Sequence, residues 1–285
     1  MSEQTDVPAA ARGTIELGGD TVVNRLGYGG MRLTGRGIWG EPADPDEARR
    51  VLRRAVELGV NFIDTAHAYG PEVNERLIGE TLSPYPDDLI VATKGGLQRG
   101  GPDLWSPDGR PETLRRECEL SLTLLRRETI DLYQLHRPDP GVPLEESLGT
   151  IVELQTEGKV RLIGISNVNV DELRRAQAVT EIVSVQNRYS FGDRSSDDVL
   201  AACEREGIVF LPWAPLESGN LTRAQRLDAI AAEHGATTGQ VALAWLLARS
   251  PAMLPIPGTS SVAHLEENVA AASLQLTPEE LTLIA

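Results

Sequence analysis

The chain has 285 residues, of which 41% are hydrophobic and 24% are charged, and this composition excludes a disordered or fibrous protein. Its 27 basic and 42 acidic residues give a formal net charge of −15, which argues against binding to nucleic acid or to an anionic membrane. The longest apolar stretch, Val241–Ala248, is too short to cross a bilayer, and residues 1–20 contain no signal-peptide core. We therefore expect a cytoplasmic protein that binds neither nucleic acid nor membrane.

The two cysteines indicate neither a disulfide framework nor a metal site. Cys118 and Cys203 lie far apart, and neither takes part in a CxxC or Cys/His spacing. No heptad pattern or long apolar edge strand demands association, so we expect a monomer.

The N-terminal region predicts a hairpin. Residues 1–12 show no periodic pattern, and we expect them to be disordered. Two short alternating runs then flank Gly18-Gly19-Asp20, which predicts a β-hairpin over residues 13–24.

From Leu26 onward, a short apolar run, a loop with Gly, Pro, Asn or Asp, and a helix-length amphipathic segment follow one another repeatedly. This repeat predicts parallel β/α units. The apolar runs are Leu26–Gly29, Asn61–Ile63, Leu89–Ala92, Ile130–Leu135, Val160–Ile165, Ile182–Val185, Ile208–Leu211 and Leu254–Ile256.

Helix signals between these runs support one continuous domain. Helix starts are indicated by Asp44-Pro45-Asp46-Glu47 and by Ser106-Pro107-Asp108 followed by Pro111-Glu112. Eight strands without a linker favour a single α/β domain over residues 1–285, a (β/α)8 TIM barrel, rather than two doubly wound domains. The cluster Gly27-Tyr28-Gly29-Gly30 lacks GxGxxG spacing, so a nucleotide would have to bind in another way.

Four polar residues stand at or just after predicted strand ends, where barrel enzymes build their active sites. Asp64 and the loop residue Tyr69 follow the second strand, Lys94 ends the third, and His136 ends the fourth. They form a coherent set, with a phenol to give up a proton, an ammonium to lower its pKa, a carboxylate to hold the ammonium and an imidazole to orient a carbonyl. Helix capping, ring packing, a solvated lysine and a core histidine are the ordinary alternatives.

The stretch Gly59–Gly70, GVNFIDTAHAYG, resembles the signature of the aldo-keto reductase superfamily. Later segments are similar to that family's motifs in the same order: Thr93-Lys94, Asp131–His136, Gly164–Asn167, Val185-Gln186, Ile256–Gly258 and Glu267-Asn268. The resemblance implies a barrel whose bottom is closed by the N-terminal hairpin, with a nicotinamide cofactor extended across the mouth. It makes Tyr69 the general acid, Lys94 and Asp64 the ion pair that tunes it, and His136 the residue that orients or polarises the carbonyl.

The resemblance also implies a set of cofactor-binding positions. Ser166, Asn167 and Gln186 would hold the nicotinamide carboxamide, and Trp213 would stack on the ring; capping, turn formation and core packing are the alternatives. The full set is Gly29, Gly30, Met31, Asp64, Ser166, Asn167, Gln186, Trp213, Ala214, Leu216, Ser218, Gly219, Asn220, Ile256, Gly258, Thr259, Ser260, His264, Glu267 and Asn268.

At the adenosine end the sequence departs from the best-known members of the superfamily. Gly258 and His264 stand where those members place a lysine and an arginine around the 2′-phosphate. The hydroxyls of Thr259 and Ser260, with free backbone N–H groups at the start of the next helix, are the remaining candidates, or they are simple helix caps. We expect NADP(H) as cofactor, with NAD(H) as the alternative.

The substrate is expected to be a small carbonyl compound, reduced to the alcohol by hydride transfer. Tyr69 and His136 would meet its oxygen, and Trp39 and Trp105 would form walls of the pocket, with ordinary packing as the alternative. Segments such as Gly37–Pro42 look like a bacterial subgroup that includes pyridoxal reductases, which suggests an aromatic or heteroaromatic aldehyde.

Two other functions remain open from the sequence. One is a barrel that binds the cofactor as a sensor with little turnover, and the other is a lyase that forms a Schiff base on Lys94. A metal hydrolase is weaker, because Asp64, His67 and His136 supply no HxH pair and no third ligand.

Overall fold

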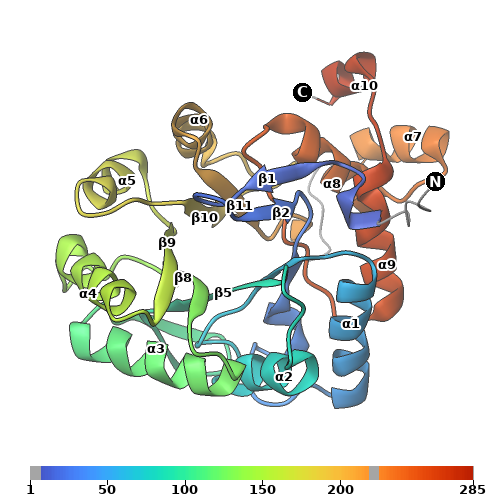
Figure 1. The fold of residues 1–285 in the computed structure, drawn as a ribbon. Helices are drawn as coiled ribbons and strands as arrows, with labels where there is room; N and C mark the ends of the chain where they lie inside the picture. Colours follow the sequence, from blue (N-terminus) through green and yellow to red (C-terminus); the bar gives the residue numbers. More distant parts are fainter. Residues whose placement is uncertain (1–7, 218–224, 285) are drawn as a thin grey trace.

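A curled sheet of seven parallel strands forms the centre of the computed structural model, which describes residues 8–217 and 225–284 (Figure 1). The order of the strands across the sheet is β11-β10-β9-β8-β5-β4-β3. The strands are β3 (Tyr28–Gly29), β4 (Phe62–Asp64), β5 (Ile90–Gly95), β8 (Ile130–Leu135), β9 (Val160–Ser166), β10 (Ser184–Arg188) and β11 (Val209–Trp213).

The eighth predicted run, Leu254–Ile256, is not a regular strand, yet it fills the gap between β11 and β3. The N–H of Leu254 donates to the Phe210 carbonyl (2.9 Å), and the N–H of Gly27 donates to the Pro255 carbonyl (2.9 Å). Pro255 and Pro257 have no N–H. Their carbonyls accept hydrogen bonds from the β3 side, but these two residues cannot donate any. The prediction of eight regular strands is therefore wrong by one, while the (β/α)8 barrel is confirmed.

The N-terminal hairpin consists of β1 (Thr14–Glu16) and β2 (Val22–Asn24), paired antiparallel as predicted. A Cβ on Gly18 in its turn would lie 2.6 Å from the side chain of Val183, just before β10, so the turn sits at the N-terminal end of the barrel strands. The prediction of a disordered start is wrong for residues 8–12, because Pro8–Ala10 form a short 3-10 helix, η1, in which Ala9 is fully buried. Residues 1–7 of the predicted disordered start lie outside the described part of the chain.

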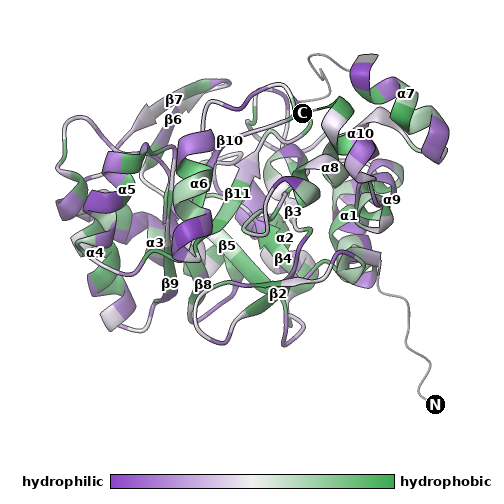
Figure 2. Cartoon of the chain, turned by 90° about the horizontal axis from the view of Figure 1, so that it is seen from above, coloured by the Kyte–Doolittle hydropathy of each residue, from purple (hydrophilic) through white to green (hydrophobic). Residues whose placement is uncertain are grey.

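Helices surround the strands, with hydrophilic residues on their outer faces (Figure 2). Asp44 caps the first of them by accepting hydrogen bonds from the N–H groups of Asp46 and Glu47, as its sequence predicts. No helix in residues 8–217 and 225–284 is long and apolar enough to cross a membrane. The helices are α1 (Pro45–Glu57), α2 (Val73–Leu82), α3 (Pro111–Leu125), α4 (Leu144–Thr156), α5 (Val170–Gln177), α6 (Asp197–Glu206), α7 (Gln225–His234), α8 (Thr238–Arg249), α9 (Val262–Ala270) and α10 (Pro278–Leu283), with short 3-10 turns η2 (Gly30–Leu33) and η4 (Ala271–Ser273).

A second hairpin, which the sequence analysis did not predict, stands between β5 and α3. Its strands β6 (Leu97–Gly101) and β7 (Leu104–Pro107) pair antiparallel, and β6 follows directly from the C-terminal end of β5. Of the predicted helix start, Pro111-Glu112 is confirmed, because α3 begins at Pro111, while Ser106-Pro107 is wrong, because these residues belong to β7. The hairpin places Trp105 at the C-terminal ends of the strands.

Candidate active site

A cleft of about 710 Å³ opens at the C-terminal ends of the barrel strands and brings most of the predicted site residues together. Its size is ordinary for a small-molecule site. Predicted residues that line it are Gly29, Met31, Asp64, Tyr69, Trp105, His136, Ser166, Asn167, Gln186, Trp213, Ala214, Leu216, Ile256, Gly258, Thr259, Ser260, His264, Glu267 and Asn268.

Lys94 lies behind Tyr69 and makes three hydrogen bonds in the barrel interior. Its Nζ donates to Asp64 Oδ2 (2.7 Å), to the Thr65 carbonyl (2.8 Å) and to the Tyr69 hydroxyl (3.4 Å). Lys94 is fully buried and Asp64 is 3% exposed, so water does not screen this ion pair. The phenol of Tyr69 thus has a fixed cation directly behind it.

The strand register explains why these groups meet. Asp64 pairs with Ala92, two residues before Lys94, across the neighbouring strands β4 and β5. The other carboxylate oxygen, Asp64 Oδ1, accepts from the side-chain amides of Gln134 (3.3 Å) and Gln186 (2.8 Å). Both oxygens of the buried carboxylate are therefore satisfied, as a buried charge requires.

The electrostatic setting fixes the charge state of each group. Burial lowers the pKa of the Lys94 ammonium, but the Asp64 charge and the Tyr69 hydroxyl more than offset it, so the pKa lies above its usual value. Burial raises the pKa of the Tyr69 phenol, and the charge of Lys94 cancels only part of that rise. The expected net lowering of the phenol pKa is not found, so Tyr69 holds its proton at neutral pH.

His136 lies beside Tyr69 as a neutral imidazole. Burial and the nearby cations Lys94, Arg137 and Arg99 hold its pKa well below the usual value. Its ring centroid is 5.8 Å from that of Tyr69, with the two rings nearly perpendicular at 83°. Its buried Nδ1 has no hydrogen-bond partner among the described residues. A protonated phenol and a neutral imidazole thus stand side by side in the cleft, the pair needed to donate a proton to an oxygen and to orient it.

The ends of β9, β10 and β11 carry a connected set of polar side chains. Asn167 has a left-handed backbone (φ 60°), and its Nδ2 donates to the His136 carbonyl (3.0 Å) and to Ser166 Oγ (3.0 Å). Its Oδ1 accepts from the indole N–H of Trp213 (3.1 Å), which fixes the plane of that ring. Asn167 caps no helix, because the cap of α5 is Asn169.

The other end of the cleft lies at the start of α9. A Cβ on Gly258 would come within 2.7 Å of the Gly29 carbonyl oxygen, so the two backbones meet too closely for a side chain there. The same Cβ position lies 3.5 Å from Cγ of Arg32, so the stem of Arg32 covers the place where a side chain at position 258 would begin. The N–H of Val262 donates to Glu47 Oε1 (3.0 Å), so this helix start is not as free of partners as the sequence analysis expected.

Some predicted site residues lie elsewhere. Gly30 does not line the cleft; its carbonyl accepts from Asn74 Nδ2 (2.7 Å), and a Cβ there would lie 2.6 Å from Asn74 Oδ1. Trp39 is not a lining residue either, although its neighbour Ile38 is. Ser218, Gly219 and Asn220 fall outside the described residues.

Seven residues that line the cleft were not predicted from the sequence. They are Arg32, Ile38, Leu97, Pro107, Arg137, Pro215 and Pro257. Arg137 follows His136 directly, so its position after a strand end was a signal that could have found it. Leu97 and Pro107 belong to the β6–β7 hairpin, which was not predicted because its sequence has no alternation of apolar and polar residues.

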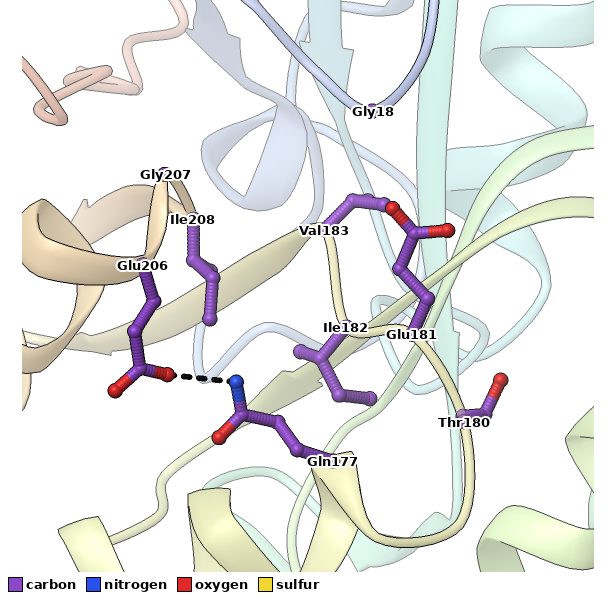
Figure 3. Close-up of a pocket in the computed structure, with 9 residues that line it drawn as sticks. All are labelled: Gly18, Gln177, Thr180, Glu181, Ile182, Val183, Glu206, Gly207 and Ile208. Carbon is purple, nitrogen blue, oxygen red and sulfur yellow. Dashed lines mark hydrogen bonds between the residues drawn. The ribbon is translucent and has the colours of Figure 1, made fainter.

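A second, smaller cavity of about 240 Å³ lies at the opposite end of the barrel (Figure 3). It is lined by Gly18 of the N-terminal hairpin and by residues that precede β10 and β11, and within it Gln177 donates to a carboxylate oxygen of Glu206 (2.6 Å). None of the predicted site residues that the structure describes lines it, so those that line a cavity lie in the cleft at the C-terminal ends. Within residues 8–217 and 225–284, no cluster of three or more His, Cys, Asp or Glu side chains could hold a metal ion.

The sequence profile of the Aldo/keto reductase family matches residues 25–285, nearly the whole length of the barrel. The chain belongs to the aldo/keto reductase family. Its relatives include an uncharacterised oxidoreductase of Schizosaccharomyces pombe, 50% identical over 96% of this chain and 89% of that protein. Pyridoxine 4-dehydrogenase of Escherichia coli is 44% identical over 93% of this chain and 95% of that protein.

A solved structure supports the barrel of this aldo/keto reductase. The aldo-keto reductase from Klebsiella pneumoniae in complex with NADPH superposes with a TM-score of 0.80 at 26% identity, covering 95% of this chain and 93% of that one. The family, the barrel and the oxidoreductase class predicted from the sequence are thereby confirmed.

Proposed function

We propose that this aldo/keto reductase uses NADP(H) to reduce an aldehyde or ketone to the alcohol, with Tyr69 as the proton donor. The observation that carries the proposal is the Tyr69 hydroxyl, which lines the cleft 3.4 Å from the buried ammonium of Lys94 and beside the neutral ring of His136.

The cleft fits an extended dinucleotide. Asn167 and Trp213 line one part of the cleft. Another part is lined by Thr259, Ser260 and His264. Gly29 and Gly258 keep the floor free of side chains where their backbones meet. When bound, the reduced nicotinamide supplies a hydride to the carbonyl carbon. An NADPH complex of a structural neighbour supports the same cofactor here.

Side chains of the protein then neutralise the negative charge that develops on the carbonyl oxygen. Tyr69 gives its proton to that oxygen, and the ammonium of Lys94 stabilises the phenolate left behind. His136, held neutral by burial and nearby cations, offers a ring N–H to the same oxygen without carrying a charge. Asp64 keeps the ammonium in place.

We further propose an aromatic or heteroaromatic aldehyde as substrate. The relative in Escherichia coli is a pyridoxine 4-dehydrogenase, and Leu97 and Trp105 give the cleft an apolar wall beside Tyr69.

Among the described residues, the large exposed apolar side chains are Val22, Trp39, Leu104, Trp105 and Leu283. Leu104 and Trp105 share β7, and Trp39 meets the same Arg99 as Trp105 beside the cleft, whereas Val22 and Leu283 lie on separate elements. We propose a monomer, because the exposed apolar residues away from the cleft form no shared patch. Light scattering on a sizing column tests that state.

The function is tested by calorimetric titration with NADPH and with NADH, followed by the loss of NADPH absorbance with pyridoxal and 4-nitrobenzaldehyde. We expect tight NADPH binding and turnover. Binding without turnover of any aldehyde would favour a sensor, and failure to bind either nucleotide would overturn the oxidoreductase proposal.

A Schiff-base lyase is disfavoured by the position of Lys94. The ammonium is fully buried, does not line the cleft and is held by Asp64. Borohydride treatment with a carbonyl substrate should leave Lys94 unmodified, which mass spectrometry of the peptides would show.

Arg32 is expected to hold a phosphate of the cofactor. It lines the cleft and covers Gly258, so it can supply the cation that position 258 lacks. Replacing Arg32 with Gln should weaken NADPH binding about tenfold, the usual scale for one charge-assisted hydrogen bond. Fluorescence titration measures it for both nucleotides: a loss for NADPH alone places Arg32 at the 2′-phosphate, and a loss for both places it at the pyrophosphate. Unchanged affinity for both would contradict the assignment.

A further inference from the structure

Arg99, on β6, uses every donor of its guanidinium on backbone carbonyls. An arginine has five N–H groups. Nε donates to Leu104 (3.2 Å), Nη1 to Ile38 (2.6 Å) and Ala68 (3.1 Å), and Nη2 to Gly37 (2.8 Å) and Gly101 (3.1 Å). Two of these carbonyls belong to residues 35–40 and one to the loop that carries Tyr69. The other two, Gly101 and Leu104, stand at the strand ends of the β6–β7 hairpin itself.

Two tryptophans flank the same guanidinium. Its Cζ lies 3.6 Å from the ring centroid of Trp105 and 5.6 Å from that of Trp39. The planar guanidinium stacks well on aromatic faces, and an ammonium could not reproduce both the stacking and the fork of hydrogen bonds. The burial of the site lowers the pKa of Arg99, yet the group remains charged.

The contacts of Arg99 lead directly to the catalytic phenol. Ala68, which accepts one of its hydrogen bonds, immediately precedes Tyr69. Trp105, which it stacks on, meets the ring of Tyr69 edge to face, with 6.5 Å between ring centroids and an interplanar angle of 86°. One side chain therefore fixes both the loop that carries the phenol and the aromatic ring beside it.

Apart from Arg99, few contacts hold the hairpin over the cleft: the N–H of Asp103 donates to the Gly37 carbonyl (3.0 Å), and the side-chain amide of Gln98 donates to Glu117 on α3. Leu104 and Trp105 on β7 are 60% and 37% exposed, and the turn between the strands is Pro102-Asp103. Leu97 is the buried apolar anchor at its base. Few buried apolar contacts make a segment of this kind prone to local opening unless a specific contact closes it.

We propose that Arg99 is a positioning residue that fastens the β6–β7 hairpin to the Tyr69 loop and so builds the aromatic wall of the substrate pocket. The inference rests on the proposed function, because the wall has a catalytic meaning only if Tyr69 donates a proton to a bound carbonyl. Arg99 itself does not line the cleft, and its N–H groups are all engaged, so it does not bind substrate.

The test compares Arg99→Met, which keeps an apolar stem on Trp105 but has no donors, with Arg99→Lys, which keeps the charge but loses the fork. In both variants we expect KM for an aromatic aldehyde to rise on the order of tenfold, with a smaller change in kcat and an unchanged dissociation constant for NADPH. Lysine should restore only part of the loss, because it offers three donors in place of five. Arg175→Lys is the matched control, since this surface arginine makes a bidentate pair with Glu145 and neither residue lines the cleft.

Hydrogen exchange measured by mass spectrometry gives a readout independent of turnover. Residues 97–107 should exchange faster in the Arg99 variants, while the core strands should match wild type. Unchanged exchange in this segment would overturn the proposal, and faster exchange with an unchanged KM would overturn the positioning role. Absence of turnover in the wild-type enzyme would instead contradict the proposed function, and the exchange data would still decide whether Arg99 fastens the hairpin.

Discussion

Replacing Tyr69 with Phe is expected to lower kcat for aldehyde reduction about a thousandfold, within the range for removing a positioned general acid. The ring, its contacts with Trp105 and His136, and the Lys94–Asp64 pair all remain, so the pocket keeps its shape. The dissociation constant for NADPH should change less than twofold. Stopped-flow turnover and a fluorescence titration of the same preparation measure both quantities.

Tyr85→Phe is the matched control for this substitution. The Tyr85 hydroxyl also donates one hydrogen bond, to the Leu125 carbonyl (2.6 Å), but it lies outside the cleft. Its loss should leave turnover unchanged. A Tyr69→Phe enzyme that kept a tenth of the wild-type rate, or that lost cofactor affinity in proportion to rate, would contradict the role of the phenol.

The raised pKa of Tyr69 predicts how the rate of reduction depends on pH. Because burial raises that pKa, the phenol carries its proton at neutral pH, and reduction should proceed at full rate there. As the pH rises through the pKa of the phenol in the folded enzyme, the proton donor is lost and the rate should fall. Oxidation of the alcohol, which needs the phenolate as a base, should rise in the same direction.

The clustering of the proposed catalytic residues was predictable from the sequence because strand ends in a parallel barrel converge at one mouth. Asp64, Lys94 and His136 each follow an apolar run, and the repeating β/α pattern brings such positions together. The register between β4 and β5 then places the carboxylate next to the ammonium. What the pattern could not give is the net pKa of Tyr69, because burial competes with the charge of Lys94 and its strength is not visible in the sequence.

The β6–β7 hairpin was not predictable for a different reason. Its sequence, Leu97 to Pro107, is rich in glycine and polar residues and has no alternating apolar pattern, so it has the signature of a loop. Hydrogen bonds from Arg99 to backbone carbonyls help to hold the hairpin in place. Contacts of this kind produce no periodic pattern in the sequence. The eighth strand position shows the converse case, where an apolar run was found but Pro255 and Pro257 prevent a regular ladder.

Replacing Asp64 with Asn is expected to affect both stability and turnover, because it leaves the buried ammonium of Lys94 without a counterion. Breaking a buried ion pair on one side costs about 3–5 kcal/mol in the free energy of unfolding. The ammonium would also lose the charge that, together with Tyr69, keeps its pKa above the usual value, so turnover should fall with it. Urea denaturation at neutral pH measures the stability, and the NADPH-coupled rate measures the turnover.

Two comparisons separate the effect of an unpaired buried charge on stability from the general effect of losing a carboxylate. Glu145→Gln removes an exposed pair with Arg175, which water screens, and should leave the free energy of unfolding almost unchanged. In Asp64→Asn, burial without a counterion should depress the pKa of Lys94 below its unfolded value. The stability deficit relative to wild type should then shrink as the pH rises, because the buried amine can lose its proton. A deficit that stays constant up to alkaline pH, or a stability equal to that of Glu145→Gln, would show that the ion pair does not hold the charge the proposed chemistry requires.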